Sequence, residues 1–122
     1  MYSLLNIIIA LLGPDAVRDD DHYPASVPSF LVPRERFIEA ARGMKKAGAR
    51  LVAEWATDER VGFGIYTCYS LDSEYIIVSC CIPKDEPTFP SLTKKFVPAS
   101  RFERQMRSLM GVIPVEIGRA HV

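Results

Sequence analysis

Histidine and cysteine are scarce in this sequence, which has two histidines and three cysteines among 122 residues. His22 and His121 both fall in expected loops, so they cannot form a histidine-based triad or a zinc site with credible spacing. Cys68, Cys80 and Cys81 are odd in number and match neither a disulfide framework nor a C-x-x-C motif. We therefore expect free, mostly buried thiols in a reducing compartment, and no bound metal or cofactor.

Net charge and long apolar runs are also lacking. Lysine plus arginine (15) equals aspartate plus glutamate (15), so nothing directs the whole chain toward nucleic acid or anionic lipid. Residues 1–13 are apolar on nearly every side, but a bilayer span takes about 20 residues, and a basic signal-peptide region is missing. This stretch is either a short helix on the core or an apolar element that docks on a partner.

Catalytic patterns are weak throughout. Gly62-Phe63-Gly64 lies between two strand-like runs, where a tight turn explains it better than a dinucleotide site. Asp58 and Glu59 are adjacent acids in an expected turn, and the acidic run 19–21 beside a histidine lacks the spacing of a calcium loop. We expect solvated loops at both places and no catalytic residues in this chain.

The periodic segments predict an α+β domain. A short strand is expected at 30–32, a helix at 34–47, and strands at 51–55, 63–71 and 75–82. Leu51, Ala53 and Trp55 alternate with Val52 and Glu54, which places the two sets on opposite faces. Short connectors favour antiparallel neighbours. The predicted fold is a mainly antiparallel three- to four-stranded sheet with helices packed on one face.

The stretch from Pro90 to Val112 is the most informative part of the chain. Its two prolines, at 90 and 98, predict a stiff extended first half. Ser100 with Glu103 three residues later predicts a capping box at the start of a helix, and Gly111 is a C-terminal cap. One helical face is apolar, and it comprises Phe102, Met106, Leu109 and Ile113.

The same stretch resembles a family signature, Pro-Ser-Leu-Thr followed by Pro-Ala-x-x-aromatic-Glu-Arg and Leu-x-Gly-Val. The family is that of the thirty-kilodalton subunit of NADH-quinone oxidoreductase, which is respiratory complex I. The chain is most similar to the related N-terminal domain of large subunits in membrane-bound nickel–iron hydrogenases of the formate hydrogenlyase type. Gln105 and Ser108 stand where complex I proper usually has acids. The resemblance implies a partner interface with the large subunit at Pro90, Ser91, Leu92, Phe96, Pro98, Ala99, Glu103, Arg104 and Gly111.

The resemblance further implies a domain without cofactor that braces the subunit responsible for quinone or hydrogen chemistry. It would lie in the cytoplasm, peripheral to the inner membrane through the complex. The competing hypothesis is a stand-alone module that binds an acidic protein or RNA through Arg101, Arg104 and Arg107. Residues 1–115 are expected to form the domain, whereas residues 116–122 depart from the family pattern and suggest a fragment with an artificial end.

Overall fold

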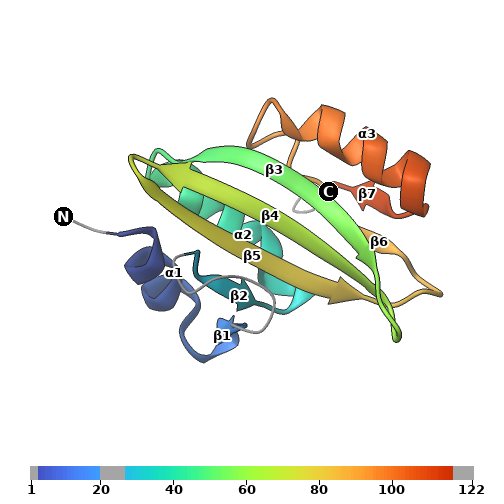
Figure 1. Cartoon of the computed structure of the whole chain (residues 1–122), viewed down its shortest axis with the longest axis horizontal. Helices are drawn as coiled ribbons and strands as arrows, with labels where there is room; N and C mark the ends of the chain where they lie inside the picture. Colours follow the sequence, from blue (N-terminus) through green and yellow to red (C-terminus); the bar gives the residue numbers. More distant parts are fainter. Residues whose placement is uncertain (1–2, 20–26, 117–122) are drawn as a thin grey trace, which may run out of the picture.

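The sheet is built on three long strands, β3 (Arg50–Asp58), β4 (Phe63–Leu71) and β5 (Glu74–Ile82), which pair in sequence as an antiparallel meander (Figure 1). These and all other details come from a computed structural model that describes residues 3–19 and 27–116. The β4–β5 turn places Asp72 at a φ of 56°, in the left-handed region where aspartate is tolerated. The antiparallel pairing expected from the short connectors is therefore confirmed.

Two short strands extend the sheet, and only the one at 17–18 lies outside the set expected from the sequence, since a short strand is predicted at 30–32. β2 (Ser29–Leu31) pairs with β5 in parallel, and β1 (Val17–Arg18) pairs antiparallel with β2, which gives the order β1-β2-β5-β4-β3. A separate parallel pair joins β6 (Thr88–Pro90) to β7 (Ile113–Val115). The main sheet thus has five strands in the described chain, more than expected, but it remains mostly antiparallel.

All three α-helices of the described residues lie on one face of this sheet, as the α+β prediction requires. They are α1 (Leu4–Leu12), α2 (Arg34–Lys46) and α3 (Ala99–Met110), and a short 3₁₀ turn, η1 (Gly13–Asp15), follows α1. In Figure 1, α2 lies behind the strands, α1 near the β5 side and α3 along the β3 edge. α3 therefore packs beside β3, the strand at one end of the sheet.

The amino-terminal helix packs on the core through one of its faces. For that face, the prediction of a short helix on the core is confirmed. Leu4, Ile8 and Leu12 are buried, and Gly43 of α2 allows close approach, since a Cβ there would lie 2.6 Å from the Leu11 side chain. Ile9 nevertheless remains 49% exposed. Asp20 and Asp21 of the acidic run and both histidines lie outside the described residues, as does the tail 117–122.

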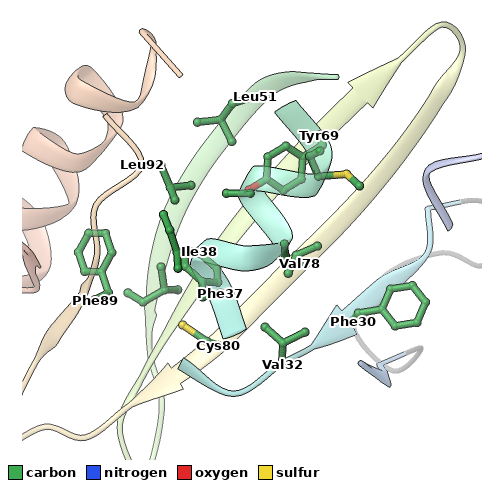
Figure 2. Close-up of a cluster of buried hydrophobic side chains, with 14 of the residues drawn as sticks. Phe30, Val32, Phe37, Ile38, Leu51, Tyr69, Val78, Cys80, Phe89 and Leu92 are labelled. Atoms are coloured by element: carbon green, nitrogen blue, oxygen red, sulfur yellow. The ribbon is translucent and has the colours of Figure 1, made fainter. Parts of the chain in front are cut away.

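The core lies between the helices and the covered face of the sheet (Figure 2). The expected stripe on α2 is buried at four of its five positions, namely Phe37, Ala40, Ala41 and Met44, with Ala47 half-buried. Figure 2 shows helix side chains in one cluster with Tyr69, Val78 and Cys80 from the strands and Phe89 and Leu92 from the chain before α3. One core therefore joins the meander to the chain that precedes α3.

The cysteines are only partly as expected. Cys80 is buried on the helix-covered face, but Cys81 is exposed and Cys68 half-buried. Adjacent strand residues point to opposite faces, so Cys80 and Cys81 cannot both enter one core. The prediction of a buried thiol is wrong for Cys81.

Candidate functional site

The extended conformation expected after Pro90 is wrong beyond the strand β6. The amides of Lys95 and Phe96 both donate to the Leu92 carbonyl at 2.9 Å, and the Ala99 amide donates to the Phe96 carbonyl at 3.1 Å. The chain therefore winds through two turns before α3. Proline stiffens this segment, but tertiary packing of Leu92 and Phe96 decides its path.

The expected capping box is also wrong, and its glutamate has a different role. α3 begins at Ala99, its N-cap Pro98 makes no side-chain cap, and the Ser100 hydroxyl donates to the Val97 carbonyl at 3.4 Å. Glu103 is only 2% exposed, and its carboxylate accepts from the Ser91 hydroxyl at 2.7 Å and the Leu92 amide at 2.8 Å. Through these two hydrogen bonds the Glu103 carboxylate attaches α3 to the Pro-Ser-Leu segment.

The predicted interface residues divide into a buried and an exposed group, with the half-buried Ser91 between them. The buried group supports the segment from inside, and it comprises Pro90, Leu92, Phe96, Ala99 and Glu103. The exposed group comprises Pro98, Arg104 and Gly111. Only the exposed group is fully open to a partner in this conformation.

Phe96 illustrates the difference. Its side chain is 7% exposed, its ring centroid lies 5.6 Å from that of Tyr69, and the Lys45 ammonium lies 5.7 Å from its ring centroid. The resemblance implies that Phe96 contacts a partner, but in this structure truncation of its ring would leave a cavity inside the domain. Its aromatic area is already used inside the domain.

The apolar face of α3 is only partly covered. Met106 is 4% exposed, but Phe102 is half-buried and Leu109 is 74% exposed. Ile113 lies beyond the helix in β7 and is 36% exposed. The prediction of one apolar helical face is therefore wrong for Ile113, which is not in the helix, and the domain's own sheet leaves Leu109 of that face uncovered. An apolar strip of α3 remains open to solvent.

A cavity of about 250 Å³ lies between β3 and α3, and we call it the β3–α3 pocket. Its strand side is formed by Glu54, Trp55 and Ala56. Its helix side is formed by Phe102, Gln105, Met106, Leu109 and Met110. The exposed strip of α3 is therefore one wall of this pocket.

Glu54 is the functional candidate that sequence reasoning placed on the wrong face. A β-bulge shifts the β3–β4 register between Leu51 and Ala53, so Glu54 pairs with Thr67 on the helix-covered face. Simple alternation had put Glu54 opposite Leu51. The signal that could have revealed it is a glutamate within an otherwise apolar strand.

Glu54 and Glu103 form a buried carboxyl pair. Glu54 is 4% exposed, and no N–H or hydroxyl group of the described residues donates a hydrogen bond to either of its oxygens. Burial, and then the neighbouring charge of Glu103 and a hydrogen bond to it, raise the pKa of Glu54 from 4.5 to about 10. One proton therefore stays on Glu54 at neutral pH and is donated to Glu103, which is already an acceptor for two other groups.

Catalytic and metal chemistry find little support in this part of the chain. Across residues 3–19 and 27–116, no group of three or more His, Cys, Asp or Glu side chains is arranged to hold a metal ion. Asp58 pairs with Lys84, and Glu59 accepts from the Thr57 hydroxyl. No helix in the same described ranges is long and apolar enough to cross a membrane.

Two solved structures have a similar fold. Nqo5, in a structure of its trypsin-resistant fragment (1-134), aligns with a TM-score of 0.76 at 18% identity and covers 91% of this chain and 94% of that one. A chain of the membrane-bound sulfane sulfur reductase, an archaeal respiratory membrane complex, aligns with a TM-score of 0.69 at 18% identity. That match covers 89% of this chain and 66% of the other. A search of curated proteins found no significant match.

At the sequence level, the family model described as respiratory-chain NADH dehydrogenase, 30 Kd subunit, matches residues 30–117. The matched region runs from β2 to the end of the described chain and contains β3, α3 and the segment between β6 and α3. It therefore covers well over half of the sequence. The chain belongs to the family of the 30-kDa subunit of respiratory-chain NADH dehydrogenase.

Proposed function

We propose that this chain is a non-catalytic structural domain of a membrane-associated oxidoreductase complex, of the NADH dehydrogenase or hydrogenase type, and that it braces the large subunit. The family membership supports the complex, and the open apolar strip of α3 supports the bracing role. Leu109, 74% exposed, lines the same pocket as the half-buried Phe102 and Met110, and a contiguous apolar surface of this kind is typical of a site that another protein covers.

The contact surface of this proposal differs from the nine residues expected from the sequence. Pro98, Arg104 and Gly111 remain candidates, and the exposed Leu109 joins them. Glu103 acts from inside, because its hydrogen bonds to Ser91 and Leu92 fix α3 relative to the segment before it. A rigid surface loses less conformational entropy when a partner binds.

In this role the chain itself holds no flavin, haem or iron–sulfur cluster and reaches the membrane only through its complex, on the cytoplasmic side. The archaeal sulfane sulfur reductase supports such an arrangement, since it is a respiratory membrane complex that contains a domain of this fold. The residues of this chain provide shape and contacts, and the redox chemistry belongs to the large subunit.

Co-expression with the large subunit tests the proposal. We expect the two chains to co-elute in size-exclusion chromatography. Leu109→Asp should weaken the complex at least tenfold, because it places a charge in a desolvated apolar contact. Val61→Asp is the matched control, since Val61 is 81% exposed in the β3–β4 connection, away from α3. Failure of the wild type to bind, or equal binding by both variants, would contradict the proposal.

A further inference from the structure

The β3–α3 pocket is lined by apolar side chains and by one acidic side chain. Phe102, Met106 and Leu109 provide most of the apolar wall, and Glu54 is the acidic group that lines the pocket. At about 250 Å³ the cavity is smaller than the roughly 300–1,000 Å³ of drug-sized ligand sites. Its size suits one long side chain better than a cofactor.

The surroundings of Glu54 lack positive charge. The titratable groups that face Glu54 are Glu103 from α3, Tyr69 from β4 and Cys80 from β5, and each is neutral or negative. No cation in the described ranges makes an ion pair with Glu54 or Glu103. Buried polar atoms almost always have partners. The proton shared with Glu103 engages only one of the two buried oxygens of Glu54, so the other needs an explanation.

Three kinds of occupant can be compared by their chemistry. An apolar side chain would fill the pocket but leave Glu54 without a partner. An acidic side chain would be repelled by the carboxyl pair. A lysine or arginine side chain satisfies both parts, because its aliphatic stem buries against apolar walls while its charged head pairs with carboxylates.

We propose that the β3–α3 pocket receives a lysine or arginine side chain of a partner protein, with the stem along Phe102 and Leu109 and the charged head at Glu54. The identity of that partner rests on the proposed function above and is the large subunit. When the head group enters, Glu54 releases its proton to solvent and the cation takes the proton's place as the partner of the Glu54 carboxylate. The exchange conserves the net charge of the pocket.

The inference is tested on the full chain with n-butylguanidinium chloride, and n-butylurea is the uncharged control of the same shape. Binding is followed by amide chemical shifts in NMR. We expect saturable shifts confined to β3 and α3 with n-butylguanidinium, and at least tenfold weaker binding of n-butylurea. Affinity should rise by about tenfold per pH unit between pH 6 and pH 8, because one proton is released on binding.

Three variants make the test specific. Glu54→Gln keeps the shape of the side chain and should lower the affinity at least tenfold, whereas Glu35→Gln, at an exposed site on α2, should leave it unchanged. Leu109→Ala shortens the wall at an exposed position and should lower the affinity severalfold without harm to the fold. The inference is overturned by equal binding of n-butylurea, by full affinity in Glu54→Gln, or by an affinity that does not rise with pH. These results do not depend on the large subunit, so the proposed function can fail or hold independently.

Discussion

Replacing Glu54 by glutamine should stabilise the protein at neutral and alkaline pH. The folded state holds a proton on Glu54 up to a pKa of about 10, whereas the unfolded chain releases it near 4.5. A raised pKa means that stability is fully present below pH 4.5 and falls as the pH rises toward 10. The slope is at most about 1.4 kcal/mol per pH unit, so by pH 7 the wild type has lost roughly 2–4 kcal/mol.

Glutamine removes this loss because it cannot ionise. Its amide N–H can donate to Glu103 as the proton of Glu54 does, and its size is the same, so no cavity is created. We therefore expect little difference between Glu54→Gln and wild type at pH 4.5. At pH 7 we expect the variant to be more stable by roughly 2–4 kcal/mol, and the gap should widen at pH 9.

Urea unfolding at pH 4.5, 7 and 9 measures this effect. Trp55 is the single tryptophan and stacks on Tyr66 at 5.5 Å between ring centroids, so its fluorescence reports the state of β3. Glu35→Gln is the control for any general effect of removing a carboxylate. A constant offset between Glu54→Gln and wild type at all three pH values would refute the reasoning, because it would mean that Glu54 titrates alike in both states.

Three further changes test other parts of the structure. Phe96→Ala should lower the free energy of unfolding by about 3–5 kcal/mol in urea melts, since its ring is buried against Tyr69; a change near zero would return Phe96 to the surface. Gly62→Ala should lower the melting temperature clearly, because the new Cβ would overlap the Ile82 carbonyl oxygen, and an unchanged melting temperature would contradict that contact. Arg104→Ala should change stability by less than about 0.5 kcal/mol, as expected of an exposed side chain with no core contact; a larger loss in the same melts would mean that it packs.

The sequence predicts the regular parts of this fold well because their physics is local. The expected strand at 63–71 matches β4, and the helix expected at 34–47 matches α2 to within one residue. Both have a strong period and clear turn residues at their ends. The strands β1, β6 and β7 have two or three residues each, too few for any period, and they form only because distant segments meet.

The site was harder to predict, because its two carboxylates depend on tertiary structure. Glu54 reaches the covered face through a bulge that alternation cannot show. Glu103 fits a capping-box pattern, but its partners are Ser91 and Leu92, which lie 12 and 11 residues earlier in the chain. A local motif predicts a local bond only when no better donors are brought near by the fold.

Leu109 shows what hydrophobic periodicity can and cannot say about a helix. Phe102, Met106 and Leu109 recur at helical spacing, and that spacing predicts one apolar face without stating what covers it. The domain buries Met106 and covers Phe102 partly, but the sheet ends at the β3 edge, so Leu109 extends past the domain's own core. If another protein covers this strip, then residues at one helical spacing make two kinds of contact. Met106 contacts the domain's own core, and Leu109 contacts the other protein. The boundary between them is the β3–α3 pocket, which is where an apolar wall and an unpaired carboxyl occur together.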